Sequence, residues 1–115
     1  MEKLITIVVR FQLEGIHRWK DAEEKEPEVD FLSFPHRHMF HFEIRKVVNH
    51  DDRDIEIILF KRAVMEYLIE KYGSPCDFDT KSCEMLAQEV ADKFECFSAQ
   101  VMEDNENGAL IQRMI

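Results

Sequence analysis

The sequence is poor in residue types that define several classes of protein. Its 115 residues include only three cysteines, Cys76, Cys83 and Cys96, an odd number without any C-x-x-C spacing. This argues against a disulfide framework and a cysteine-based zinc finger, and it predicts reduced thiols in a cytoplasmic setting. No apolar run approaches the roughly 20 residues of a membrane-spanning helix, and no signal-peptide pattern precedes the first β-branched run. We therefore expect a cytoplasmic protein without a membrane partner.

Positive charge is also scarce. The chain has 15 lysines and arginines against 24 aspartates and glutamates, a net charge of −9. A surface that binds nucleic-acid phosphates needs a basic stripe, so the composition predicts no nucleic-acid partner. A few local arginines could still hold a small anionic ligand. The length and the absence of repeats, low-complexity tracts and linkers predict a single domain over residues 1–115.

The most informative stretch, residues 34–42, contains three histidines within six residues. Its pattern is typical of a β-strand, in which alternate side chains share a face. His36 and His38 would therefore lie on the same face as the apolar residues that follow them. Two imidazoles so placed can hold one metal ion if a third ligand comes from elsewhere. The best candidate is His17, at the end of the preceding apolar run and on its core side if the strand is regular.

Hydrophobic periodicity predicts five strands and two helices. We expect strands over residues 4–17, 36–48, 53–60, 97–103 and 109–115, and amphipathic helices over residues 61–72 and 82–94. We also expect residues 18–33 to form a solvated polar loop and residues 36–48 to form a hairpin with residues 53–60. Residues 104–108 should form a tight turn, because they contain the asparagine–glycine signal of a hairpin. The order strand-strand-strand-helix-helix-strand-strand predicts an α+β fold, an antiparallel sheet with two helices on one face.

Four segments resemble the 6-pyruvoyl-tetrahydropterin synthase and 6-carboxytetrahydropterin synthase family, which has the tunnelling fold (T-fold). The first is residues 11–19, which include His17, and the second is residues 36–40, which contain the H-x-H pair His36 and His38. The third and fourth are residues 81–87 and residues 101–103. The resemblance spans nearly the whole chain in the right order. It implies a T-fold, a zinc ion on His17, His36 and His38, and a homo-oligomer, a trimer or hexamer, with sites between subunits. Zinc accepts three imidazoles and leaves a fourth position open.

The resemblance also implies that Glu103 anchors a heterocycle. A carboxylate can accept two parallel hydrogen bonds from the amino and ring N–H groups of a pterin or guanine edge. Trp19 could stack on a flat ligand or pack against the base of its own loop. Arg18, Arg37 and Arg53 could meet oxygens or phosphates. The expected ligand is a purine- or pterin-like heterocycle or a nucleotide.

The sequence departs from the family pattern where that family transfers protons. The family's catalytic cysteine lies four residues before the H-x-H pair, and Leu32 stands there in this chain. The family also uses an aspartate–histidine pair between its helices. Residues 73–81 contain Asp77 and Asp79 but no histidine. An aspartate alone is a poorer proton shuttle near neutral pH.

Three hypotheses remain open. The first is a zinc-binding T-fold protein that binds a heterocycle or nucleotide without converting it. Such a protein could serve to sequester a nucleotide. The second is a synthase-like zinc lyase that acts on dihydroneopterin triphosphate, with His41, His50, Asp51 or Asp52 as a substitute base. The third is a metal-free structural or interaction protein whose open sheet edges make oligomer contacts.

Overall fold

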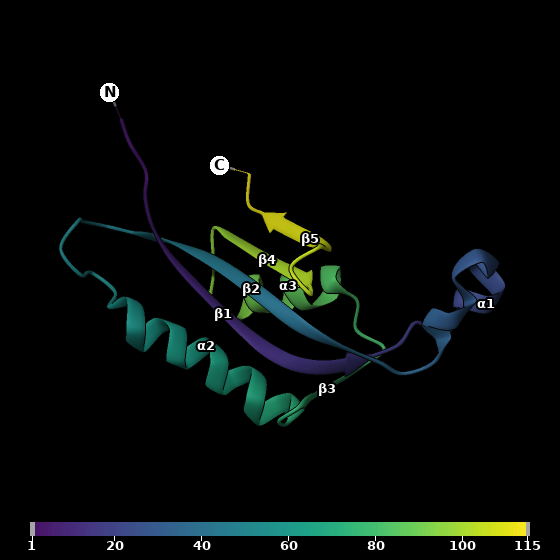
Figure 1. The fold of residues 1–115 in the computed structure, drawn as a ribbon. Helices are drawn as coiled ribbons and strands as arrows, with labels where there is room; N and C mark the ends of the chain where they lie inside the picture. The colour runs from purple at the N-terminus through teal and green to yellow at the C-terminus, as the bar shows by residue number, and fades with distance from the viewer. Residues whose placement is uncertain (1, 115) are drawn as a thin grey trace.

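The computed structural model describes residues 2–114, which form a five-stranded sheet with two long helices packed against it (Figure 1). The elements are β1 (Ile5–His17), α1 (Ala22–Lys25), the 3-10 helix η1 (Pro27–Ser33), β2 (His36–Val48), α2 (Ile57–Tyr72), β3 (Cys76–Asp79), α3 (Cys83–Lys93), β4 (Ser98–Glu103) and β5 (Asn107–Gln112). The strand order is β3-β1-β2-β4-β5, and every pairing is antiparallel except that of β1 with β3. The predicted α+β class is confirmed. No helix within the described residues is long and apolar enough to cross a membrane.

The centre of the sheet is the long pairing of β1 with β2. It runs without interruption from Ile5 opposite Val48 to His17 opposite His36. The alternation expected in both strands is observed, because Phe11 on β1 and Phe40 and Phe42 on β2 are buried against the helices while their sequence neighbours are not. The ladder therefore ends at a pair of histidines that share the core face.

The predicted third strand over residues 53–60 is wrong. Helix α2 begins at Ile57, four residues before the predicted helix start at 61, and a loop over residues 49–56 precedes it. The alternating apolar residues fitted a strand. However, the Glu56 carboxylate accepts hydrogen bonds from the backbone N–H groups of Ile58 and Leu59, and so caps a helix start. The hairpin partner of β2 is consequently β1.

A short strand occupies a segment that the sequence predicted as a loop. Strand β3 pairs in parallel with the end of β1, with Gly15 opposite Cys76, and it carries Phe78 into the core. A Cβ atom on Gly15 would lie 2.5 Å from Cε2 of Phe78 and 2.9 Å from Cδ2 of Phe40. Glycine is therefore required here by close packing. Apart from the short helices within residues 18–33, the order of elements along the chain is therefore strand-strand-helix-strand-helix-strand-strand.

Residues 18–33, predicted as a solvated loop, contain the short helices α1 and η1. They form an arm that extends beyond the end of the sheet (Figure 1). Apart from the half-buried Arg18, its charged residues are exposed, whereas Ala22 is fully buried. The backbone N–H of Trp19 donates to the carbonyl of Leu32 at 2.7 Å, which closes the base of the arm. Trp19 and Leu32 are thereby held next to the histidine end of the β1–β2 ladder.

The predicted C-terminal hairpin is present, but its turn lies at different residues. Asp104 and Asn105 have φ angles of 53° and 57°, the positive values that both central residues of a type I′ turn require. Gly108 lies within β5, where a Cβ atom would fall 1.9 Å from the Val101 carbonyl oxygen. The last strand runs from Asn107 to Gln112 rather than over 109–115, and residue 115 lies outside the described residues.

Glu89 on α3 joins the two long helices. Its carboxylate accepts hydrogen bonds from Tyr67 Oη at 2.7 Å, Lys71 Nζ at 2.8 Å and Tyr72 Oη at 2.5 Å, all on α2. Burial by itself raises the pKa of Glu89, but the bonds from Lys71, Tyr72 and Tyr67 outweigh it and lower that pKa. The ionised form of Glu89 is therefore the one that stabilises the fold.

We expect Glu89→Gln to lower the free energy of unfolding at neutral pH by about 1–3 kcal/mol, because a charged acceptor is lost. A lowered folded-state pKa contributes stability above the unfolded pKa that is lost as the pH falls through the folded value. Between about pH 6 and pH 3, which brackets the ordinary glutamate pKa, the variant should lose less stability than the parent. Urea unfolding at stepped pH measures this, with exposed Glu70→Gln as the control. Parallel pH profiles for parent and Glu89→Gln would contradict the prediction.

Candidate metal centre and adjoining cavity

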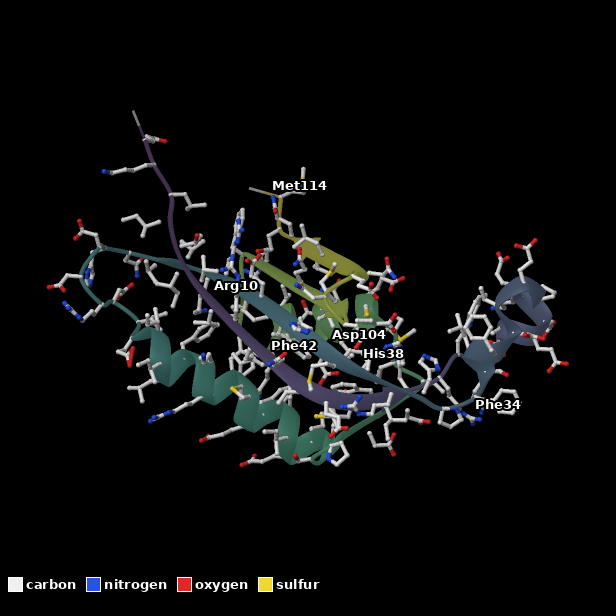
Figure 2. All side chains as sticks on the ribbon, in the orientation of Figure 1. Arg10, Phe34, His38, Phe42, Asp104 and Met114 are labelled. Carbon is white, nitrogen blue, oxygen red and sulfur yellow. The ribbon has the colours of Figure 1, made fainter. Side chains whose placement is uncertain are left out.

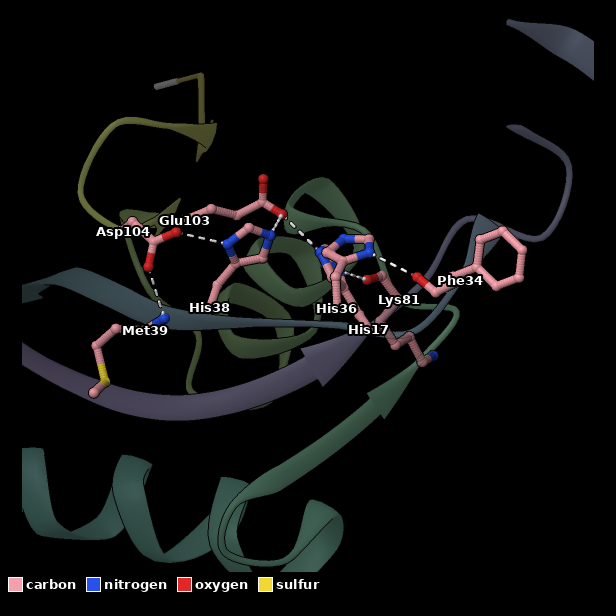
Figure 3. Close-up of polar contacts among 8 residues, drawn as sticks. All are labelled: His17, Phe34, His36, His38, Met39, Lys81, Glu103 and Asp104. Carbon is pink, nitrogen blue, oxygen red and sulfur yellow. Dashed lines mark hydrogen bonds and ion pairs between the residues drawn. The ribbon is translucent and has the colours of Figure 1, made fainter. Parts of the chain in front are cut away.

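Three histidines and one glutamate meet at the end of the β1–β2 ladder (Figure 3). His17 is paired with His36 across the two strands, and His38 follows on the same face of β2. Glu103, the last residue of β4, is paired with Phe40. One imidazole nitrogen from each histidine and one carboxylate oxygen of Glu103 all lie within 4.8 Å of one another. The structure thus places His17, the candidate third ligand, beside the H-x-H pair His36 and His38.

Each imidazole is oriented by a hydrogen bond at Nδ1. The partners are the Lys81 carbonyl for His17 at 2.8 Å, the Phe34 carbonyl for His36 at 2.9 Å, and Asp104 Oδ2 for His38 at 2.6 Å. Carbonyl and carboxylate oxygens only accept hydrogen bonds, so Nδ1 is the donor in each ring. A neutral ring then keeps its lone pair on Nε2. Such an outer hydrogen bond is the usual way in which a metal-binding histidine is oriented.

The fit to a cation is clearest at His17. Its side chain is 10% exposed, and Nε2 lies 2.7 Å from Glu103 Oε2. With the proton on Nδ1, the buried Nε2 has no hydrogen-bond donor among the described residues. Two acceptors this close are stabilised only by a cation or an added proton between them. The donor set of three imidazoles and one carboxylate suits Zn²⁺.

The electrostatics favour positive charge at this point. Burial by itself lowers the pKa of His17. In the protonated ring, however, Nε2–H donates to Glu103 and Nδ1–H to the Lys81 carbonyl, and these contacts outweigh burial and raise that pKa. The same contact with His17 lowers the pKa of Glu103 against the opposing effect of burial. Glu103 Oε2 also lies 3.4 Å from His38 Nε2. The glutamate expected to anchor a heterocycle therefore lies inside the histidine cluster.

A cavity of about 550 Å³ adjoins the cluster. This volume lies in the usual range of about 300–1,000 Å³ for small-molecule sites. His17, His36 and Glu103 form part of its lining. The arm, the segment that leads into α3, the first residues of α3 and Gly108 of β5 form the rest. Helix α3 is capped by Ser82, whose side chain accepts from the backbone N–H of Met85 at 3.1 Å.

The other residues expected to contact a ligand lie in three different regions. Arg18 and Trp19 line the cavity. Arg37 points to the opposite face of β2, where it is hydrogen-bonded to Glu14. Arg53 lies in the loop after β2, and this 13-residue strand spans roughly 40 Å at about 3.3 Å per residue. Neither Arg37 nor Arg53 lines this cavity within the described chain.

The substitute bases considered for a lyase also lie elsewhere. His41 contributes to a polar depression on the helix-free face of the sheet. His50, Asp51 and Asp52 lie in the loop between β2 and α2. None of the four lines the cavity formed by the described residues.

Cys83 and Asp104 are among the residues of the site that were not predicted from the sequence. Cys83 lines the cavity, although the amphipathic pattern placed it only in the buried stripe of α3. Burial first, and then Glu103 and Glu84, raise the pKa of the Cys83 thiol to about 12, so it stays protonated near neutral pH. Asp104 contacts His38, whereas the sequence indicated only a turn residue. The one available signal was its position next to Glu103.

No family model matches this sequence, and no curated protein matches it. Among solved structures, this chain is similar to 6-pyruvoyl tetrahydropterin synthase from Caenorhabditis elegans, with a TM-score of 0.66. The alignment covers 97% of this chain and 97% of that one, at 10% sequence identity. An identity this low shows the fold alone. The T-fold implied by the four sequence segments is thereby confirmed, and the chain has the fold of 6-pyruvoyl tetrahydropterin synthase over nearly its whole length.

Proposed function

We propose that this chain binds Zn²⁺ through His17, His36 and His38, and holds a purine- or pterin-like heterocycle or a nucleotide beside the metal without converting it. The observation that carries the proposal is the buried Nε2 of His17. Its ring is fixed by the Lys81 carbonyl, and it faces a carboxylate oxygen without a donor between them. Bound zinc would supply a Lewis acid for an oxygen of the ligand.

The lining of the cavity supports a flat, partly polar ligand. Trp19 and Leu32 offer apolar surface on one side, and Met85 does so from α3. The second oxygen of Glu103 is available to accept from ring and amino N–H groups, since His17 and His38 approach Oε2. Arg18 lies at the same cavity and suits an oxygen or phosphate of the ligand.

The same lining supports binding rather than turnover. Leu32, at the position where the resemblance places a cysteine, has no group that can accept a proton. Cys83 is the one cysteine that lines the cavity of the described chain, and its pKa is raised to about 12. A thiol that is protonated near neutral pH is a poor general base. Product formation from dihydroneopterin triphosphate by the purified protein would favour the lyase instead.

We also propose that the chain assembles as a homo-oligomer, a trimer or hexamer, within the cytoplasm. The sheet supports this because β3 and β5 are its edge strands and leave backbone groups unpaired on their outer sides. Unpaired edges favour pairing with another chain. The arginines that lie away from the cavity, Arg37 and Arg53, would then be available to a neighbouring subunit's site.

Glu103→Gln separates the two parts of the proposed function. We expect the variant to retain one zinc ion per chain but to bind a guanine nucleotide or pterin at least tenfold more weakly. Glutamine replaces the charged acceptor by a neutral amide, and a hydrogen bond to a charged group is worth about 1.5–3 kcal/mol. Titration calorimetry with zinc-loaded protein, using guanosine, GTP and pterin as probes, measures the change.

The matched control is Glu84→Gln, which alters a carboxylate at the same cavity outside the histidine cluster. It should leave both affinities near the parent values. Loss of zinc together with the heterocycle in Glu103→Gln would make Glu103 a metal ligand and contradict its proposed role as an anchor. A folded parent protein that takes up no zinc would support the metal-free alternative.

A further inference from the structure

Asp104 is hydrogen-bonded to His38 of the candidate metal centre but has no part in the function proposed above. It is the first residue of the β4–β5 turn and directly follows Glu103. Its Oδ2 lies 2.6 Å from His38 Nδ1, and its Oδ1 accepts the backbone N–H of Met39 at 3.0 Å. Its own backbone N–H donates to the Met39 carbonyl at 2.8 Å. Figures 2 and 3 show His38 and Asp104 side by side.

We propose that Asp104 is a positioning residue. It holds His38 in the tautomer that carries the proton on Nδ1 and directs the unprotonated Nε2 toward the other residues of the histidine cluster. The inference rests on the proposed function only in taking the centre to be a metal site. The other two histidines have backbone carbonyls at Nδ1. His38 alone depends on a side chain for its orientation, because the partner of its Nδ1 is a carboxylate.

The two hydrogen bonds of Asp104 explain why the residue must be an acceptor at both oxygens. Met39 N–H donates to one oxygen and His38 Nδ1–H to the other, so a group with a single acceptor cannot satisfy both. The tautomer of a histidine is set by the hydrogen bond at its other nitrogen. Without an acceptor at Nδ1, the proton of His38 can move to Nε2, the atom that must be bare to bind a metal.

A purely structural role for Asp104 makes a different prediction. The residue lies at φ 53°, a conformation that asparagine adopts as readily as aspartate. If Asp104 served only to form the turn, Asp104→Asn would change neither the tautomer of His38 nor the zinc affinity. If it positions His38, the same change is harmful. The amide oxygen would keep the Met39 N–H, and the NH₂ group would donate to His38 Nδ1 and force the proton onto Nε2.

The test compares Asp104→Asn and Asp104→Gly with the parent. Glycine removes the carboxylate without strain at positive φ. Asn105→Gly is the matched control, because Asn105 is the other positive-φ residue of the turn and lines the depression beside His41, outside the histidine cluster. Ring ¹⁵N NMR of metal-free protein, above the ordinary histidine pKa of about 6.5, reports the tautomer. Competition with a chelator reports the zinc affinity.

We expect Nδ1–H on His38 in the parent and Nε2–H in Asp104→Asn. Zinc affinity should fall about 10- to 100-fold in both Asp104 variants, the usual effect of losing such an outer partner, and stay unchanged in Asn105→Gly. Parent-like tautomer and affinity in Asp104→Asn would overturn the inference. A parent that shows the tautomer change on substitution but binds no zinc would support the positioning role and contradict the proposed function instead.

Discussion

Replacing His17 by alanine is expected to lower the zinc affinity of the chain at least a hundredfold. Structural zinc sites contribute about 10–16 kcal/mol, so one of three or four ligands accounts for roughly 3–4 kcal/mol, or a factor of roughly 10²–10³. His17 is also the most buried member of the cluster. Its loss leaves Glu103 without its closest partner. Chelator competition and the zinc-dependent rise in the melting temperature measure the effect.

The chain provides a matched control for this experiment. His41 lies on β2 as His36 and His38 do, but it faces the helix-free side of the sheet. His41→Ala should therefore bind zinc as the parent does. Parent-like zinc stoichiometry and affinity in His17→Ala would show that the cluster is not a metal centre, and the cavity would then have to be explained without a metal.

Gly15→Ala is expected to lower the free energy of unfolding by about 1–3 kcal/mol, the usual cost of overpacking a core, and to weaken zinc binding with it. The added methyl group would lie 2.5 Å and 2.8 Å from two atoms of the Phe78 ring. Phe78 and Phe40 are fully buried and pack edge to face at 4.9 Å, so neither ring can move freely. Displacement of β3 would also displace Lys81, whose carbonyl orients His17.

A double-mutant cycle identifies the cause of this loss. Phe78→Leu removes the ring atoms that the new methyl group would meet, so the double variant should be more stable than the sum of the two single losses predicts. Urea unfolding of the four proteins measures the coupling. Strictly additive losses would mean that backbone conformation at Gly15, rather than the contact with Phe78, causes the destabilisation.

The sequence predicted the elements whose patterns are long. The alternation in β1 and β2 placed His36 and His38 on the core face. The helical period over residues 82–94 predicted a stripe of six buried residues. Five of them are buried in α3, and the sixth, Phe94, is half-buried at its C-cap; the five are Cys83, Leu86, Ala87, Val90 and Ala91. These segments bury one face over many residues, so their period leaves little choice. The histidine pair could be located from spacing because the strand that carries it is regular.

The elements that were missed depend on contacts distant in sequence or on local capping. Ile55, Ile57 and Leu59 alternate as in a strand, but Glu56 caps a helix there, and such a short run fits both structures. Strand β3 has only four residues and exists because it pairs with the end of β1. The contact of Asp104 with His38 joins residues 66 positions apart. Apart from its position next to Glu103, no local pattern indicated it.

The arm over residues 18–33 leaves and re-enters the sheet at one point, because His17 and His36 are opposite each other in the ladder. The number of residues in the arm therefore has no influence on strand register. A one-residue slip within β1 or β2 would turn the imidazoles to the other face, whereas a longer or shorter arm would leave them in place. A change in the length of the arm would thus reshape the entrance of the cavity while the histidine cluster stays the same.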